Sequence, residues 1–137
     1  MVRPICKDNF LLSMKSAPAT AEDLGTAQDL LDTLAAHSHE CVGMAANMIG
    51  VLKRIVVFQD GAKLTVMVNP TITKRSGKEY EAEEGCLSHS GTKTATRFES
   101  IEVEYLDMKM KKQRKRYSGF TAQIIQHECD HLDGILI

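Results

Sequence analysis

The segment Gln126-His127-Glu128-Cys129-Asp130-His131 contains the pattern H-E-x-x-H. Residues four positions apart lie on one face of a helix, so His127 and His131 could bind a single metal ion together. Glu128, directly after the first histidine, could then accept and donate a proton at the same site. Two histidines at this spacing also occur on polar helix surfaces, and the pattern therefore needs a third ligand before it indicates a metal centre.

The third ligand is expected upstream of this pattern. On the C-terminal side only Asp133 has a suitable side chain, and it lies too close to His131 to bend back easily to the same ion. The strongest upstream candidate is Cys86, because a thiolate is a soft, anionic ligand. A single cysteine is more often a buried, unreactive thiol, so this residue alone leaves both interpretations open. Glu84 and Arg97 could form an ion pair that holds this strand, or could be two solvated surface charges.

Length and composition are those of a globular protein with one domain, residues 1–137. The chain is 43% hydrophobic and 26% charged, and its net charge of −1 predicts no general attraction to DNA or to an anionic membrane. No apolar run approaches the roughly 20 residues of a membrane span, and the N-terminal segment lacks the apolar stretch of a signal peptide. Scattered cysteines without a C-x-x-C pair indicate free thiols or metal ligands. We therefore expect a cytoplasmic protein.

A helix followed by strands is predicted after an irregular first segment that ends near residue 19. Residues 20–23, Thr-Ala-Glu-Asp, have the form of a capping box, and an apolar stripe at steps of three and four residues follows as far as Leu34. Runs rich in β-branched side chains at 54–58 and 64–68 predict two strands, and the pair Asn69-Pro70 is expected to end the second.

The C-terminal half is predicted to contain further strands and the helix that carries the histidines. Alternation at 101–105 indicates a strand, and the basic stretch 109–116 is its expected hairpin partner. From Ser118 onward the spacing is helical, with Phe120 and Ile124 facing inward. Strands flanked by two helices, without β–α–β alternation, indicate an α+β fold.

Three separate blocks occur in order along the chain: Gly43-Met44-Ala45-Ala46, Glu84-Gly85-Cys86-Leu87-Ser88 and residues 126–132, Gln-His-Glu-Cys-Asp-His-Leu. Together they resemble the three signature motifs of the peptide deformylases, and the resemblance extends over nearly the whole chain. It implies antiparallel β-sheets around a central C-terminal helix that carries H-E-x-x-H, with an N-terminal helix. It also implies a hydrolase that removes the formyl group from the N-terminal methionine of newly made polypeptides.

The resemblance assigns roles to individual residues. Cys86, His127 and His131 would hold one divalent metal ion, Fe²⁺ natively, with Zn²⁺ or Ni²⁺ as replacements in purified protein. A water molecule in the fourth position would attack the formyl carbon, with Glu128 as general acid and base. The backbone N–H of Leu87 would donate to the oxyanion that forms during the attack.

The resemblance also implies substrate contacts and partners. Gly43, Gly85 and Leu87 would line the substrate site, and the N-termini of nascent polypeptides would be the partners. His89 could line the substrate entrance because it lies near Cys86 in sequence, and a surface histidine is an equally good explanation. The basic stretch 109–116 could approach the ribosome surface, although a solvated hairpin is the simpler explanation of its charge. We expect a monomer or a weak dimer.

The first block departs from the family pattern at two positions. The family has a glycine where this chain has Cys41, and a glutamine where it has Met48. The glutamine amide donates to the oxyanion, whereas Met48 has no hydrogen-bond donor. Loss of one such donor costs on the order of 10²–10³ in kcat. The amide of Asn47 would point about 100° away on a helical turn. Outside this block, Gln123 replaces a common arginine.

Three functions remain open at this level. The favoured one is an active deformylase with a reduced rate or an altered substrate preference. The second is a deformylase-like paralogue that keeps its metal and binds formylated or otherwise acylated N-termini with weak or no turnover. The third is an ordinary H-E-x-x-H metallopeptidase, which a cysteine ligand from a distant strand disfavours.

Overall fold

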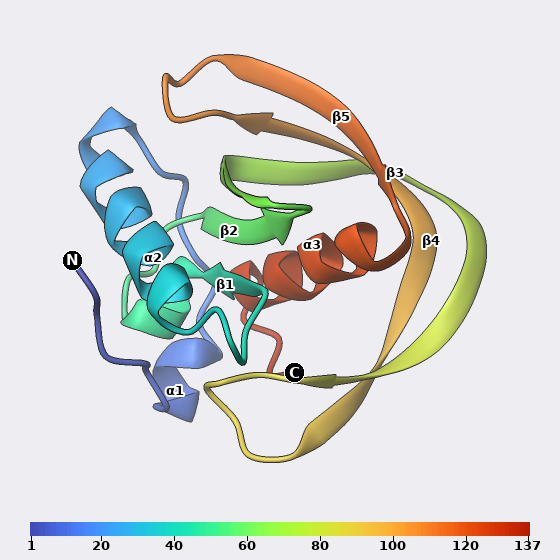
Figure 1. Ribbon diagram of the computed structural model, residues 1–137, viewed down its shortest axis with the longest axis horizontal. Coiled ribbons are helices and arrows are strands. Elements are labelled where there is room, and N and C mark those ends of the chain that lie inside the picture. The colour runs from blue at the N-terminus through green and yellow to red at the C-terminus, as the bar shows by residue number, and fades with distance from the viewer.

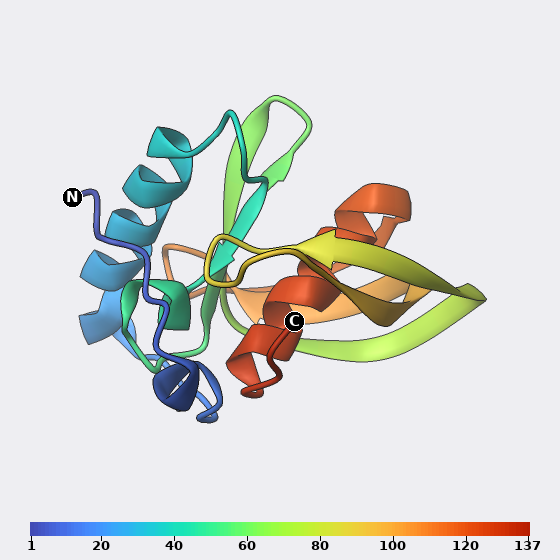
Figure 2. The same ribbon diagram turned by 90° about the horizontal axis from the view of Figure 1, so that it is seen from below.

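One five-stranded antiparallel sheet lies between two helices in the computed structural model, which describes residues 1–137 (Figures 1 and 2). The strands lie in the order β1-β2-β3-β4-β5, with bounds Gly43–Ala45, Ile55–Asp60, Lys63–Gly85, Thr92–Leu106 and Lys112–Ser118. The α-helices are α1 (Asn9–Leu12), α2 (Leu24–Ala36) and α3 (Gly119–Leu132), and 3₁₀ turns occupy Ala21–Asp23 and Ala46–Ile49. The α+β prediction is confirmed, with one bent sheet where several were expected.

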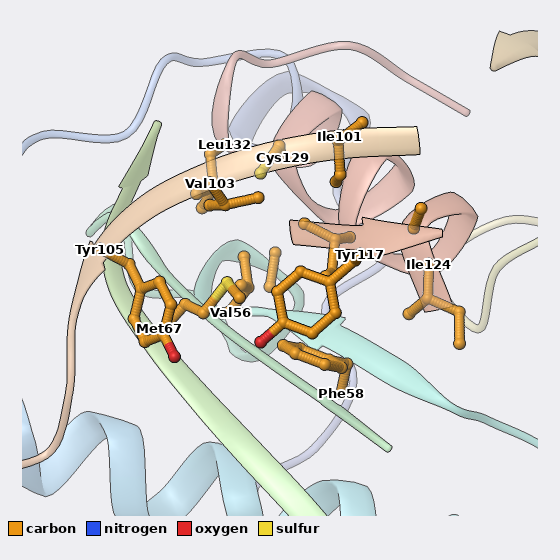
Figure 3. Close-up of a cluster of buried hydrophobic side chains, with 13 residues drawn as sticks. Val56, Phe58, Met67, Ile101, Val103, Tyr105, Tyr117, Ile124, Cys129 and Leu132 are labelled. Atoms are coloured by element: carbon orange, nitrogen blue, oxygen red, sulfur yellow. The ribbon is translucent and has the colours of Figure 1, made fainter. Parts of the chain in front are cut away.

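The two faces of the sheet carry two hydrophobic clusters, one beside each long helix. Val56 and Phe58 of β2 pack with apolar side chains of α3 (Figure 3). Ile55 and Val57, which alternate with them, belong to the second cluster, with Leu30 of α2. Because β2 is covered on both faces, all four side chains are buried and the strand sequence is continuously apolar.

Strands β3 and β4 are long, and they sweep around α3 (Figure 1). β3 has 23 residues, and register shifts after Val68, Ile72 and Ser76 interrupt its pairing with β4. Irregularities of this kind bend a strand and increase its twist. As a result, the last residues of β3 and the return loop 86–91 lie beside the helix that carries the histidines.

The pair Asn69-Pro70 does not end its strand, and this prediction is wrong. Asn69 has a left-handed backbone, with φ of 52°. Its side chain accepts a hydrogen bond from the N–H of Ala19 at 2.7 Å and donates one to the carbonyl oxygen of Ala19 at 2.9 Å. These bonds hold the chain through a local irregularity, after which β3 pairs with β4 again at Thr71.

Other sequence predictions are largely confirmed. The capping box at Thr20 is present and starts a 3₁₀ turn that leads into α2. Of the basic stretch 109–116, residues 112–116 lie in β5, and 109–111 belong to the turn before it. The first segment contains α1, capped by Asp8, where only irregular chain was expected. Phe120 is 63% exposed although it was predicted to face inward, because the first turn of α3 borders an open cavity. None of the helices combines the length and the apolar character needed to cross a bilayer.

Candidate metal and catalytic site

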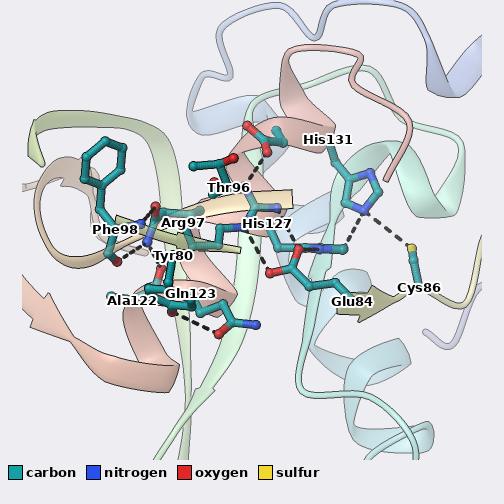
Figure 4. Close-up of polar contacts among 12 residues, drawn as sticks. Tyr80, Glu84, Cys86, Thr96, Arg97, Phe98, Ala122, Gln123, His127 and His131 are labelled. Carbon is teal, nitrogen blue, oxygen red and sulfur yellow. Dashed lines mark hydrogen bonds and ion pairs between the residues drawn. The ribbon is translucent and has the colours of Figure 1, made fainter. Parts of the chain in front are cut away.

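Helix α3 and the end of β3 bring three potential metal ligands together. His127 and His131 lie one turn apart on α3, and their Nε2 atoms are 3.0 Å apart. The Sγ atom of Cys86 is 3.4 Å from Nε2 of His131 (Figure 4). All three ligand atoms lie within 4.8 Å of one another. The structure therefore brings together the three residues that the sequence analysis grouped as ligands.

These residues fit a tetrahedral metal ion. Metal–nitrogen bonds of about 2.0 Å and metal–sulfur bonds of about 2.3 Å place neighbouring ligand atoms about 3.3–3.6 Å apart, close to the 3.0 and 3.4 Å found here. Burial lowers the pKa of His131 to about 3, so its imidazole is neutral, as a ligand must be. Two imidazoles and a thiolate leave the fourth position for water or substrate.

The buried carboxylate of Glu84 forms a hydrogen bond with the ring nitrogen of His127 that faces away from the metal-ligand cluster. Nδ1 of His127 lies 2.8 Å from Oε1 of Glu84, and Arg97 donates to both carboxylate oxygens of Glu84 at 2.7 and 3.0 Å. Arg97 also donates to Asp130 at 2.6 Å. Although burial opposes its charge, the hydrogen bonds from His127 and Arg97 lower the pKa of Glu84 to about 2. A carboxylate in this position fixes the orientation and tautomer of a metal-binding histidine.

The sequence left open whether Glu84 and Arg97 form an ion pair or are solvated surface charges, and the structure shows the ion pair. Both side chains are buried, with 8% and 3% exposure, and neither is a solvated surface charge. The pair therefore belongs to the site, because it sets the position of His127.

Glu128 is the second carboxylate of the site, and its environment differs from that of Glu84. It is 4% exposed, and its Oε1 has no hydrogen-bond partner in the protein. Burial raises the pKa of Glu128 to about 7. Gly43 of β1 packs directly against it: a Cβ atom at this position would lie 2.9 Å from Oε2 of Glu128 and 2.7 Å from Cγ2 of Ile124. A buried carboxyl with a pKa near neutrality can both accept and donate a proton.

A cavity of about 500 Å³ opens onto these groups. Its walls come from three parts of the chain, the segment around β1, the end of β3 with its return loop, and α3. They are formed by Glu40, Cys41, Val42, Gly43, Met48, Glu83, Glu84, Gly85, Cys86, Leu87, Gly91, Phe120, Gln123, Ile124, His127 and Glu128. The cavity therefore gives a substrate access to a potential metal centre and to a proton-transferring carboxyl.

A family model described as polypeptide deformylase matches residues 3–137. The chain belongs to the polypeptide deformylase family. The curated peptide deformylase of Clostridium beijerinckii is 52% identical over 137 residues, covering 100% of both sequences. A peptide deformylase of Dehalococcoides mccartyi is 36% identical over 140 residues, covering 98% of this chain and 83% of that protein.

Solved peptide deformylases share the fold. The class I type b enzyme of Acinetobacter baumannii, bound to Met-Ala-Ser, has a TM-score of 0.89 with 31% identity, covering 99% of this chain and 97% of that one. The peptide deformylase of Thermotoga maritima has a TM-score of 0.89 with 28% identity, covering 99% and 95% of the two chains. The likeness therefore includes the sheet, α3 and the segments that build the cavity.

The 3₁₀ turn Ala46–Ile49 decides which side chain of the first deformylase motif faces the cavity. Met48 lines the cavity and is 1% exposed. Asn47 points elsewhere: its Nδ2 donates to the carbonyl oxygen of His131 at 2.9 Å. The amide of Asn47 therefore points away from the position of Met48, as the sequence predicts, and is bonded to α3.

The candidate substrate residues divide into two groups. Gly43, Gly85 and Leu87 line the deformylase cavity. His89 does not, and the prediction that it lines the substrate site is not supported. Its ring stacks on that of His131, with centroids 6.5 Å apart and an angle of 26° between the planes. The short loop 86–91 turns the side chain toward α3 because the N–H of His89 donates to the carbonyl oxygen of Cys86.

Sequence analysis noted Gln123 and Cys41 as departures from the family pattern but did not predict their contacts in the wall of the cavity. The hydroxyl of Tyr80 donates to Oε1 of Gln123 at 3.0 Å and fixes an amide in the wall (Figure 4). Gln123 lies four residues before His127 on α3, and this spacing was a usable signal. The thiol of Cys41 also lines the wall and donates to the carbonyl oxygen of Gly43 at 3.0 Å. Burial raises the pKa of Cys41 to about 12, so it stays protonated and is a poor metal ligand.

Proposed function

We propose that this protein removes the formyl group from the N-terminal methionine of newly made polypeptides, with Cys86, His127 and His131 holding one divalent metal ion and Glu128 transferring the proton. The observation that carries the proposal is the convergence of these three ligand atoms at the cavity wall that also contains the buried carboxyl of Glu128. Family membership over residues 3–137 supports the same reaction.

The metal ion, Glu128 and the ion pair of Glu84 with Arg97 would have separate roles in the reaction. The bound ion supplies Lewis acidity, which polarises the formyl carbonyl and lowers the pKa of water. Glu128 accepts the proton of the attacking water and returns it to the departing amine. Burial raises the pKa of the Glu128 carboxyl, and the positive charge of a bound ion would oppose this rise and favour the carboxylate that accepts the proton. Glu84 and Arg97 keep the ring of His127 in place throughout.

The developing oxyanion would find one donor fewer than the family pattern provides. The backbone N–H of Leu87, next to the ligand Cys86, is our assigned donor. Met48 occupies the place of the second donor and offers none. We therefore expect a deformylase that turns over slowly, with a deficit in kcat.

Peptide substrates would bind in an extended form between two strand ends. Gly43 belongs to β1, an edge strand, and Gly85 ends β3 on another wall of the cavity. Unpaired backbone groups at strand edges are natural partners for an extended peptide. The Acinetobacter baumannii enzyme was solved with the tripeptide Met-Ala-Ser, and formyl-Met-Ala-Ser is accordingly our test substrate.

The metal and the cellular setting form the finer part of the proposal. We assign Fe²⁺ as the native ion, with Zn²⁺ or Ni²⁺ able to replace it in purified protein. A cysteine ligand makes the iron-loaded site sensitive to oxidation. The protein would act in the cytoplasm as a single domain, residues 1–137, and as a monomer or weak dimer. Its basic strand β5 would face the ribosome surface where nascent chains emerge.

The experiment is to strip the protein with a chelator under anaerobic conditions and to reload it with Fe²⁺, Zn²⁺ or Ni²⁺. We expect one ion per chain and formate release from formyl-Met-Ala-Ser only in the loaded forms, fastest with Fe²⁺. Acetyl-Met-Ala-Ser serves as the matched acyl control and should remain intact. Tight binding of both peptides to loaded protein without formate release would refute the proposal in favour of an acyl-peptide binding protein.

A further inference from the structure

The ring of His89 lies beside that of His131. The two rings are nearly parallel, with centroids 6.5 Å apart. His89 lies three residues after the ligand Cys86, in the loop 86–91, and its N–H donates to the carbonyl oxygen of Cys86 at 3.1 Å. One short loop therefore carries a metal ligand and places an imidazole beside a second ligand.

The two ligand histidines differ in what supports them. Nδ1 of His127 has Glu84 at 2.8 Å. Nδ1 of His131 is buried in a side chain with 0% exposure and has no partner in the protein. A metal-binding histidine almost always donates its second ring N–H to an acceptor, because this bond fixes the ring and its tautomer.

Two further buried polar atoms without partners lie in the same loop. They are Nε2 of His89 and Oγ of Ser88, and Ser88 is 4% exposed. Buried polar groups without hydrogen bonds are rare in proteins, and a small number in one region indicates a shared partner such as a buried water.

We propose that His89 is a positioning residue, which orients His131 toward the metal through one buried water molecule shared with Ser88. The water would accept from Nδ1–H of His131 and donate to Nε2 of His89 and to Oγ of Ser88, which satisfies all three atoms. Two hydrogen bonds of about 2.8 Å to one water span roughly 4.6 Å between the nitrogens, a span compatible with ring centres 6.5 Å apart. This inference rests on His131 being a metal ligand, as proposed above.

The arrangement has a consequence for metal binding that is separate from substrate binding. With Nδ1 of His131 protonated and bonded to water, the lone pair of Nε2 is directed at the metal. His89 lies outside the cavity wall, so its loss should weaken the metal site and leave peptide contacts in place. Loss of a group that supports a metal ligand typically costs 10–100-fold in metal affinity.

The test compares two replacements of His89 with a surface control. His89→Phe keeps a flat ring and removes both nitrogens, whereas His89→Gln keeps hydrogen-bonding atoms. His39→Phe is the matched control, because the side chain of His39 is 75% exposed. The readouts are the visible spectrum of the Co²⁺-loaded proteins and the transfer of Zn²⁺ to a competing chelator. Far-UV circular dichroism of the metal-free proteins checks that each variant folds.

We expect His89→Phe to bind Zn²⁺ about 10–100-fold more weakly and to shift the Co²⁺ bands, with His89→Gln closer to the parent and the control unchanged. If His89→Phe does not fold, Ser88→Ala provides the test and should weaken Zn²⁺ binding several-fold. Parent-like affinity and spectrum in His89→Phe would overturn the inference, as would equal losses in the Phe and Gln variants. Because metal binding is measured without substrate, a parent that binds metal but releases no formate would refute the proposed function alone.

Discussion

Asn47 donates a hydrogen bond from its side chain to the carbonyl oxygen of His131, 84 positions away in the sequence. Asn47 is fully buried, and its bond ties the 3₁₀ turn of the first motif to the end of the helix that carries both histidines. The next residue, Met48, consequently faces the cavity. The turn places residue 48 at the cavity, and because this residue is a methionine, the position offers no hydrogen-bond donor.

Met48→Gln is expected to accelerate the reaction. The new amide would donate to the oxyanion, and one such donor is worth on the order of 10²–10³ in kcat. The change should appear in kcat, with little effect on KM, because the bond forms in the transition state. Steady-state formate release from formyl-Met-Ala-Ser measures both constants.

The matched control is Met48→Leu, which keeps the apolar character and adds no donor. Its kcat should stay near that of the parent. Equal kcat values for the Gln and Leu variants would show that a missing donor does not limit this enzyme.

Gly43→Ala should damage the site through a direct clash. The added methyl group would lie 2.9 Å from Oε2 of Glu128 and 2.7 Å from Ile124, so the carboxyl has to move. Misplacement of a catalytic group by about 1 Å costs up to roughly 10²-fold in rate. Gly25→Ala is the control, because a Cβ atom there meets nothing within 4 Å. If Gly43→Ala retained full kcat/KM, Gly43 would not set the position of Glu128.

Arg97→Ala should destabilise the protein strongly. It removes the partner of a buried carboxylate, Glu84, and breaking a buried pair in this way costs about 3–5 kcal/mol. Arg114→Ala is the matched surface control, since Arg114 is 65% exposed and pairs with Glu102 and Glu104. Its loss should cost less than about 1 kcal/mol. Urea unfolding of the metal-free proteins at pH 7 gives both values, and similar losses would contradict the assigned role of burial.

Asp107 should make stability depend on pH at the turn between β4 and β5. Its carboxylate accepts hydrogen bonds from the backbone N–H groups of Lys111 and Lys109 at 3.0 and 2.8 Å, and these bonds lower the pKa of Asp107 below its usual value. Because the folded-state pKa is lowered, the stabilisation is complete above the unfolded pKa of about 3.9 and is lost as the pH falls through the folded-state value.

Asp107→Asn tests this pH dependence. The thermal unfolding midpoint of the variant should lie below that of the parent at pH 7, and the two should converge on acidification below about pH 4. If the difference between the two unfolding midpoints were the same at pH 7 and in acid, the charge of the Asp107 carboxylate would make no contribution to stability.

The two histidines of the proposed metal site could be paired from sequence because their spacing is local, whereas Cys86 joined them only through the resemblance to the family motifs. His127 and His131 share one helix face by periodicity alone, and a cysteine of suitable chemistry lies in a second block. The ion pair of Glu84 with Arg97 was open between a buried and a solvated form, because sequence does not report how far β3 bends around α3. The bend comes from register shifts that leave no residue pattern comparable to a cap or a turn.

The errors arose where side-chain bonds or exposure override local preference. Asn69 continues β3 because its side chain is bonded to Ala19, fifty positions earlier in the chain. Phe120 has the spacing of a core residue, but its turn of α3 borders the cavity and not the sheet. His89 was assigned to the substrate entrance by its proximity to Cys86 in sequence, and the structure shows that its ring lies beside that of His131.

The most direct measurement is formate release from formyl-Met-Ala-Ser by Fe²⁺-loaded protein under anaerobic conditions, beside Glu128→Gln loaded with the same ion. We predict turnover by the parent and a loss of about 10²–10⁴-fold in the variant, with one metal ion per chain in both. Absence of formate from the loaded parent, or equal rates in the two proteins, would contradict the account.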